Sequence, residues 1–346
     1  MKSANKAEPP HRDYYIVTYD VASRLQSFRT ETLSVPDLND PRFEVFHRSL
    51  LDHVQQALPG VNVHNIHMVD LGHSIWEKIH YLIDHTGDQV VLSTCPEISM
   101  ASQLMDAKSK AESHVLHFNR LFDVNGEMLG YGPRPGFTSM DWQLSDLIAR
   151  LGGRKVVLIE DGAFTGGTLY FVLSRLIAYG VRVSAVVVGF CTPVALGRVR
   201  QVFDGQVIVV NEVEGLIDWV PDHDLVPFTP NCGRVLGEST PQGFMPVRTS
   251  DGVTCAYPYI LPFGKMGEWT SLPDDGARNL SRFCLEMSID LFNEVGSYEG
   301  HQITIGELVR NYPRVSIPIS IGLHEDLPSL DTKVTAFLKE ALQKLK

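Results

Sequence analysis

The sequence has 346 residues, of which 44% are hydrophobic and 21% charged, a balance typical of a folded protein and not of a disordered or collagen-like chain. Its 41 acidic and 30 basic residues give a net charge of −11, which argues against non-specific binding to nucleic acid or to anionic membranes. The length predicts about two domains and a core large enough to fold without disulfides or metal ions.

Predicted strands and helices alternate along the first part of the chain. Short runs of β-branched and aromatic residues predict the strands, and apolar residues at helical spacing predict the helices. Residues 115–131 resemble a hairpin, because Asn125-Gly126 supplies a two-residue turn in which both residues tolerate positive φ. The other expected elements are strands at 13–20, 61–69 and 89–93 and helices at 41–58, 74–85 and 96–111.

The stretch from residue 142 to residue 210 gives the clearest pattern. Its strands are nearly continuous runs of Val, Ile and Leu, which are typical of a parallel sheet covered by helices on both faces. We therefore predict an α/β fold with a doubly wound, mainly parallel sheet. The expected elements are strands at 155–159, 181–189 and 206–210 and helices at 142–151, 168–179 and 194–202.

Beyond residue 236 the pattern changes. Prolines are frequent up to residue 275, and helices are expected at 277–295 and 330–345. We predict three units, which are an N-terminal extension at 1–60, an α/β core at 61–236 and an appended, α-rich C-terminal module at 237–346.

Residues 156–169 read VVLIEDGAFTGGTL and carry the strongest functional signal. A buried strand delivers Glu160 and Asp161 to its carboxyl end, where ligands bind in doubly wound sheets. The loop at 162–167 then opens a helix, so its N–H groups and the helix N-terminus favour an anion. The two carboxylates suit the hydroxyls of a sugar whose phosphate lies in the loop, with Mg²⁺ moderating the charge.

This strand, acidic pair, short loop and T-G-x-T run resembles the binding motif for 5-phosphoribosyl 1-pyrophosphate (PRPP) in the type I phosphoribosyltransferases. The resemblance identifies the chain as a diverged member and implies Mg²⁺-dependent transfer of a phosphoribosyl group to or from a nucleobase-like acceptor. It implies that Glu160 and Asp161 are catalytic and hold the ribose hydroxyls. The loop for the 5-phosphate would comprise Ala163, Phe164, Thr165, Gly166, Gly167 and Thr168.

The resemblance also implies a loop that binds pyrophosphate after an earlier strand. It falls at Ser93, Thr94 and Cys95, which offer hydroxyls but no Lys, Arg or Gly. We expect positive charge to come instead from the following helix and hairpin, where the candidates are Lys108, Lys110, Arg120 and Arg134.

A hood that recognises the base is implied at residues 216–236, a segment rich in Trp, Phe, Asp and Pro. Trp219 would stack on the base, and Asp222 or Asp224 would bind a metal ion or an edge of the base. The alternative for Trp219 is that it packs in the core. No protein residue is assigned as a direct Mg²⁺ ligand, because the ion would be held mainly through the substrate.

Three functions fit these features. The first is an enzyme of the phosphoribosyltransferase type. The second is a regulator that binds PRPP or a nucleotide without turnover, and the third is an effector that attacks a cellular nucleotide under the control of partner proteins. We expect a small-molecule substrate, a homo-oligomer or a complex with partner proteins, and no direct binding of nucleic acid.

The five cysteines are widely spaced and include no C-x-x-C pair, so neither a disulfide framework nor a zinc site is indicated. The first residues lack the apolar segment of a secretory signal, and no apolar run approaches the ~18 residues that a membrane span needs. We therefore expect a cytoplasmic protein with reduced cysteines.

Overall fold

A five-stranded parallel sheet carries the segment with the acidic pair. Its strands lie in the order β10-β9-β8-β4-β5, and each neighbouring pair is parallel. The computed structural model describes residues 14–29, 33–86, 89–96, 98, 112–297, 300–322 and 327–345. The strands of this sheet are β4 (Gln89–Ser93), β5 (Ser113–Val115), β8 (Lys155–Ala163), β9 (Val183–Cys191) and β10 (Gln206–Glu212).

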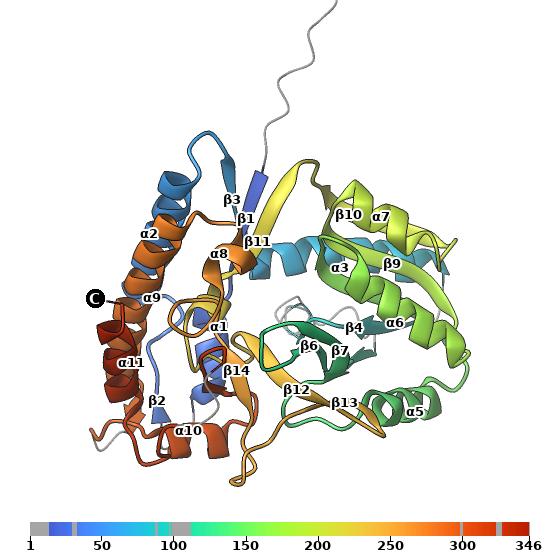
Figure 1. The fold of residues 1–346 in the computed structure, drawn as a ribbon. Helices are drawn as coiled ribbons and strands as arrows, with labels where there is room; N and C mark the ends of the chain where they lie inside the picture. The colour runs from blue at the N-terminus through green and yellow to red at the C-terminus, as the bar shows by residue number, and fades with distance from the viewer. Residues whose placement is uncertain are drawn as a thin grey trace, which may run out of the picture.

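Helices cover both faces of this sheet. Side chains along each strand point alternately to its two sides, so an apolar strand contributes to the core on both faces. Val156 and Leu158 of β8 belong to the core formed with α5, α6 and α7, whereas Val157 and Ile159 belong to the core formed with α3. The predicted α/β fold with a doubly wound, mainly parallel sheet is therefore confirmed (Figure 1). The helices are α3 (Met68–Thr86), α5 (Met140–Leu151), α6 (Gly167–Ala178) and α7 (Pro193–Val199).

The strands and helices expected in this region are present, with two qualifications. β8 continues beyond Ile159 to Ala163, so the expected loop shortens to residues 164–166. The extension follows from pairing with β9, because Ala163 still lies opposite Cys191. The helix expected at 96–111 lies almost entirely outside the described residues, as do the candidates Lys108 and Lys110.

The expected hairpin forms from β6 and β7, but its turn is longer than predicted. Residues 123–127 lie between the strands, and Asp123 Oδ1 accepts hydrogen bonds from the N–H groups of Asn125 and Glu127 at 2.9 and 2.8 Å. An Asp side chain that bonds the backbone in this way stabilises a wider loop. The prediction of a two-residue turn is therefore wrong, although Gly126 does adopt a positive φ of 76°.

A second sheet joins the N-terminal extension to the core. In it β1 lies between β3 and β11 and is parallel to both. This pairing crosses the expected boundary at residue 60. The division into three units therefore remains a prediction, namely that each unit can fold by itself. The strands are β1 (Tyr14–Tyr19), β3 (Asn62–His67) and β11 (Leu216–Pro221).

A third, mixed sheet links the hairpin to the C-terminal segment, in the order β16-β14-β12-β6-β7. β12 pairs in parallel with β6 and antiparallel with β14 and β13, so this sheet crosses the expected boundary at residue 236. The strands are β6 (Phe118–Phe122), β7 (Met128–Pro133), β12 (Arg234–Thr240), β13 (Gly243–Pro246), β14 (Cys255–Tyr257) and β16 (Ile317–Pro318).

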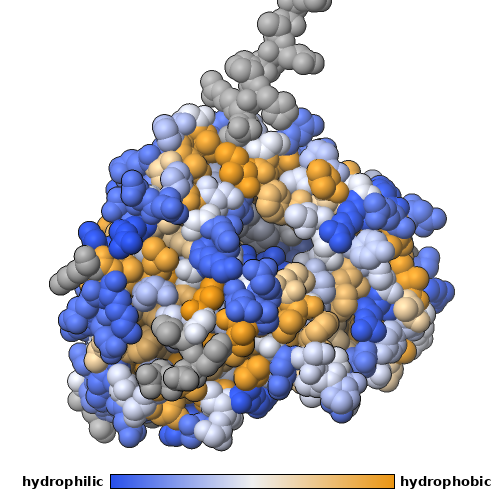
Figure 2. Space-filling view, in the orientation of Figure 1, coloured by the Kyte–Doolittle hydropathy of each residue, from blue (hydrophilic) through white to orange (hydrophobic). Residues whose placement is uncertain are grey.

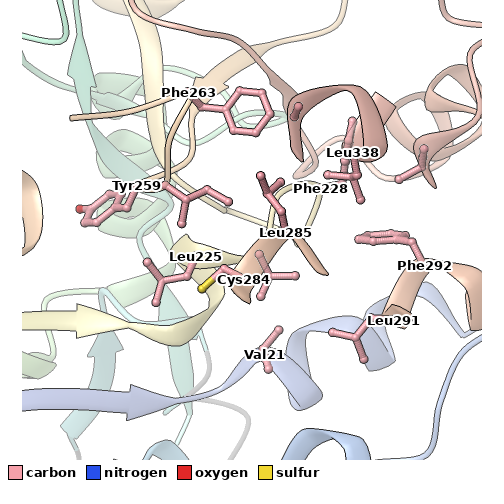
Figure 3. Packing of buried hydrophobic residues seen from close by; sticks show 14 of the residues in the cluster. Val21, Leu225, Phe228, Tyr259, Phe263, Cys284, Leu285, Leu291, Phe292 and Leu338 are labelled. Atoms are coloured by element: carbon pink, nitrogen blue, oxygen red, sulfur yellow. The ribbon is translucent and has the colours of Figure 1, made fainter. Parts of the chain in front are cut away.

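The N-terminal and C-terminal additions share one hydrophobic core. Val21 of α1 packs in the same cluster as Phe292 of α9 and Leu338 of α11 (Figure 3). These helices lie on one side of the molecule and the five-stranded sheet on the other, and Figure 2 shows the face between them hollowed, with hydrophilic residues around the hollow. None of the described helices is both long enough and apolar enough to cross a membrane. The remaining elements are α1 (Val21–Leu25), η1 (Gln26–Phe28), β2 (Leu33–Ser34), α2 (Pro41–Ala57), α8 (Met266–Thr270), α9 (Asp274–Glu294), β15 (Gly296–Ser297), α10 (Ile305–Asn311) and α11 (Val334–Gln343).

Candidate functional site

Glu160 and Asp161, the acidic pair, lie near the carboxyl end of β8 and line a polar cavity of about 180 Å³. Glu160 is buried and accepts a hydrogen bond from the hydroxyl of Thr94. Burial, followed by the neighbouring carboxylate of Asp161, raises the pKa of Glu160 well above its ordinary value. Asp161 is only half-buried, and its Oδ1 accepts the N–H of Gly162 at 2.7 Å. The two acidic side chains therefore differ in environment, with Glu160 held toward its neutral form.

The proposed phosphate loop joins β8 to α6. Gly166 precedes the helix in a left-handed conformation, and no side chain caps the first N–H groups of α6. These N–H groups can therefore bind an anion, which the helix dipole also favours. Thr192, which follows β9, fixes the loop from behind, because its Oγ1 donates to the carbonyl of Phe164 at 2.6 Å and its N–H donates to that of Ala163 at 3.1 Å.

All six loop candidates lie in the wall of a second cavity, of about 150 Å³, which shares residues with the first. Thr168, Trp219 and Arg120 are among the residues that line both. The structure thus places the acidic pair and the predicted phosphate loop in two neighbouring polar cavities that share part of their walls. The loop residues in this wall are Ala163, Phe164, Thr165, Gly166, Gly167 and Thr168.

The two glycines of the loop are expected to respond differently to substitution. A Cβ on Gly166 would lie 2.7 Å from the carbonyl oxygen of Ala195 in α7, and the φ of 70° is unfavourable for other residues. Gly166→Ala should therefore lower the free energy of unfolding by about 1–3 kcal/mol. A Cβ on Gly167 meets first the hydroxyl of Tyr131 at 3.2 Å, which can move, so Gly167→Ala should fold almost normally.

Thermal denaturation of both variants beside the parent checks this prediction. Equal stability of the two variants would show that the backbone of α7 yields to a side chain at residue 166. Gly167→Ala is then the cleaner probe of anion binding, because it crowds the loop without disturbing its packing on α7.

The predicted pyrophosphate loop is only partly turned toward the cavity. Thr94 lines the cavity, whereas Ser93 and Cys95 are buried and bond each other: Ser93 Oγ donates to the Cys95 carbonyl at 2.6 Å and accepts its N–H at 3.0 Å. Arg134 lies against this loop, because its Nη2 donates to the carbonyl of Thr94 at 3.2 Å and its Nε donates to that of Phe118 at 3.0 Å. Of the three candidates, only Thr94 is placed to reach a ligand.

Two further arginines line both cavities. Within the described part of the chain, the guanidinium of Arg120 has no hydrogen-bond or ion-pair partner. Arg234, which the sequence analysis missed, lies 4.0 Å from the ring centre of Trp269 and 5.3 Å from that of Tyr259. Aromatic faces hold a guanidinium in place without neutralising it, so Arg234 keeps its charge available to an anion. Its only sequence signal was its position at the end of the predicted hood.

The predicted hood spans β11, the short helix η2 (Asp222–Leu225) and the start of β12. Trp219 lines both cavities, donates from Nε1 to Thr18 Oγ1 at 3.1 Å and packs edge-on against Phe190. Asp224 also lines the larger cavity. Asp222 does not, because it is fully buried and its Oδ1 accepts the backbone N–H groups that follow β1. Trp219 and Asp224 are therefore placed to meet a ligand, and Asp222 is not.

The N-terminal segment supplies cavity residues that the sequence analysis did not identify. Asp20, Arg24 and Thr18 line the larger cavity, as does His223 of η2. Among the described residues, ligand atoms of Asp20, Asp222 and His223 lie within 4.8 Å of one another, as a metal site would require. However, Arg24 Nε already lies 2.5 Å from Asp20 Oδ2, and two backbone N–H groups occupy Asp222 Oδ1. Most atoms of this cluster thus already have partners, whereas Asp222 Oδ2 is buried without a hydrogen-bond partner among the described residues. Metal binding by Asp222 or Asp224 stays a prediction.

Comparison with known proteins gives only distant likenesses. No family model matches the sequence, and no curated protein matches it. A purine phosphoribosyltransferase from Pyrococcus horikoshii is 16% identical over 44% of this chain and 87% of its own, with a TM-score of 0.27. An orotate phosphoribosyltransferase from Francisella tularensis is 17% identical over 42% and 63%, with a TM-score of 0.27. A hypothetical protein from Neisseria gonorrhoeae with bound ppGpp is 12% identical over 44% and 82%, with a TM-score of 0.30. Similarity at this level assigns neither a family nor an activity.

Proposed function

We propose that this protein is a Mg²⁺-dependent enzyme of the phosphoribosyltransferase type, which binds PRPP or a related phosphorylated ribose and transfers the sugar to or from a nucleobase-like acceptor. One observation carries the proposal: the acidic pair, the uncapped loop of α6 and four arginines line two neighbouring polar cavities that share part of their walls. An anion loop and cations at a cavity that also contains carboxylates suit a ligand with phosphates and sugar hydroxyls.

Each part of this ligand has a matching part of the cavity. The 5-phosphate would bind the N–H groups of the loop, and the ribose hydroxyls would bind Asp161 and Glu160. The pyrophosphate would lie between Thr94, Arg120 and Arg134. Departure of pyrophosphate leaves an oxocarbenium-like sugar, whose positive charge the carboxyl group of Asp161 would stabilise. Catalysis would then consist largely of positioning and electrostatics.

Mg²⁺ fits this donor set. A hard cation takes oxygen ligands and is usually held by one or two carboxylates together with substrate phosphates. Asp161 offers a half-buried carboxylate in the cavity wall, beside a phosphate loop. The ion would be held mainly through the substrate and would supply charge compensation to the pyrophosphate as it leaves.

Calorimetric titration with Mg²⁺-PRPP tests the proposal, followed by a pyrophosphate-release assay over a panel of free purines and pyrimidines. Saturable binding followed by release with one base or class of bases is the expected result. Binding without release from any base would favour the regulator that binds PRPP without turnover. Absence of binding would refute the proposed function.

Trp219 should contribute to binding of the base rather than of PRPP. Stacking of an aromatic ring on a base is worth about 1–3 kcal/mol, so Trp219→Ala should lose that much base affinity. Affinity for Mg²⁺-PRPP should change much less, because Trp219 borders the cavity of the phosphate loop but the N–H groups that would bind phosphate belong to another strand–helix connection. Trp219→Phe is the matched control, since it keeps the ring beside Phe190 but loses the hydrogen bond to Thr18. Joint loss of both affinities and of thermal stability in Trp219→Ala would mark a core residue instead.

A further inference from the structure

His223 occupies a position between two carboxylates in the wall of the larger cavity. Its Nδ1 lies 2.8 Å from Asp20 Oδ1, within hydrogen-bond distance. Its Nε2 lies 3.4 Å from Asp224 Oδ1, which is longer than an ordinary N–H···O hydrogen bond, and that oxygen also accepts the N–H of Gly233 at 2.7 Å. Asp20 therefore fixes the ring through Nδ1, while Nε2 remains available to a ligand in the cavity.

Asp20 is held as an anion. Burial alone would raise the pKa of Asp20, but the Arg24 guanidinium at 2.5 Å and His223 together hold it well below its ordinary value. Its backbone is also fixed, because Asp222 Oδ1 accepts the N–H groups of Asp20 and Val21, both at 2.9 Å. A carboxylate in a fixed position accepts the Nδ1–H of the imidazole, so Nε2 is the ring nitrogen left to a ligand.

We propose that His223 is the proton-transfer residue of this site and that Asp20 is the residue that positions it. The inference rests on the proposed function. Nε2 takes the proton from a ring N–H of the acceptor, and the electron pair of that nitrogen forms the bond to the anomeric carbon of the ribose. The bond from that carbon to pyrophosphate breaks, and pyrophosphate leaves with the electron pair. The proton on His223 then passes to solvent, and in the reverse direction His223 returns a proton to the base.

This assignment also narrows the acceptor. The groups around His223 are the carboxylates of Asp20 and Asp224 at its two nitrogens, Arg24 behind Asp20, and Asp222 beside it in η2. Such a wall is rich in hydrogen-bond acceptors, so it suits a heterocycle that presents N–H groups, one of which loses its proton on transfer. An acceptor that attacks through a carboxylate would be disfavoured here.

The competing interpretation is structural: His223 and Asp20 simply fasten η2 to the N-terminal segment. Pyrophosphate release with Mg²⁺-PRPP and the panel of bases, measured against pH, separates the two. The variants are His223→Gln, Asp20→Asn and His223→Ala with added imidazole. His47→Gln is the matched control. Like His223, His47 is buried beside a carboxylate, since its Nδ1 lies 4.0 Å from Asp222 Oδ2, but His47 does not line the cavity.

We expect kcat/KM to fall by about 100- to 10,000-fold in His223→Gln, the range for loss of a general base. The acid limb of the pH profile should disappear in that variant, and imidazole should restore part of the activity of His223→Ala. Asp20→Asn should lower kcat more than it changes KM, and His47→Gln should keep the parental pH profile.

A parental pH profile in a folded His223→Gln variant, as judged by its thermal denaturation, would overturn the inference and leave the proposed function intact. Binding of Mg²⁺-PRPP without release from any base would overturn the inference and leave only the binding part of the proposed function. Failure to bind Mg²⁺-PRPP at all would overturn both.

Discussion

Asp161→Asn is expected to lower phosphoribosyl transfer by about 100- to 1,000-fold, the range for loss of one group aimed at the charge that develops in a transition state. The amide keeps the shape of the side chain and its bond with the N–H of Gly162, but it cannot stabilise positive charge on the sugar. Glu160→Gln should have a much smaller effect, because the pKa of Glu160 is raised and the amide resembles its neutral form. The double variant should lose at least as much transfer as Asp161→Asn. Pyrophosphate release at saturating Mg²⁺-PRPP measures all three.

The two single variants act as controls for each other. If Glu160→Gln is as damaging as Asp161→Asn, Glu160 reacts as an anion and the assignment of the two environments is wrong. If the double variant keeps its activity, both residues are structural and the mechanism fails.

Stability against pH checks the state of Glu160 independently of turnover. A carboxyl whose pKa is raised on folding binds its proton more tightly in the folded state, so the parent loses stability as pH rises from the ordinary value of 4.5 toward the folded pKa. Glu160→Gln removes that loss. Its free energy of unfolding should match that of the parent at about pH 4 and exceed it at neutral pH. The contribution of Asp20 to the free energy of unfolding depends on pH in the opposite direction. Folding lowers the pKa of Asp20, so its contribution to stability is lost as pH falls.

The parts of the site that could be predicted are those that lie together in the sequence. The strand at 155–159 is apolar because helices cover both of its faces, and the acidic pair and the loop follow it directly. Strand, carboxylates and loop form one local unit, so their arrangement depends little on the rest of the chain. Composition and spacing were sufficient there, apart from the extension of β8 to Ala163, which depends on its register with β9.

The remaining cavity residues depend on contacts between distant segments. His223 meets Asp20 across 203 positions because β1 pairs with β11, and no local pattern indicates that pairing. The sequence also does not show whether a single side chain points into the cavity or into the core. Ser93 and Cys95 bond each other, while Thr94 between them turns to the cavity. A run of three adjacent polar or small residues does not show which of them faces a ligand.

Loss of the charge of Arg120 should weaken binding of Mg²⁺-PRPP more than loss of any other surface cation. Arg120 is exposed and lines both cavities, and its guanidinium has no described hydrogen-bond or ion-pair partner, so its donors remain available to phosphate oxygens. A hydrogen bond to a charged group contributes about 1.5–3 kcal/mol, so Arg120→Met should raise the dissociation constant roughly 10- to 150-fold. Because no hydrogen bond or ion pair to a described residue is lost with the guanidinium of Arg120, thermal stability should hardly change.

Arg150→Met is the matched control, since it removes the same charge from a residue that is ion-paired with Asp146 at 2.9 Å and lines neither cavity. Calorimetry at two salt concentrations completes the test, because a direct contact with phosphate makes the affinity of the parent more dependent on salt than that of Arg120→Met. Equal losses in Arg120→Met and Arg150→Met would mean that only net charge matters. Binding of the pyrophosphate would then depend on Thr94 and Arg134, and Arg120 would have no direct contact with it.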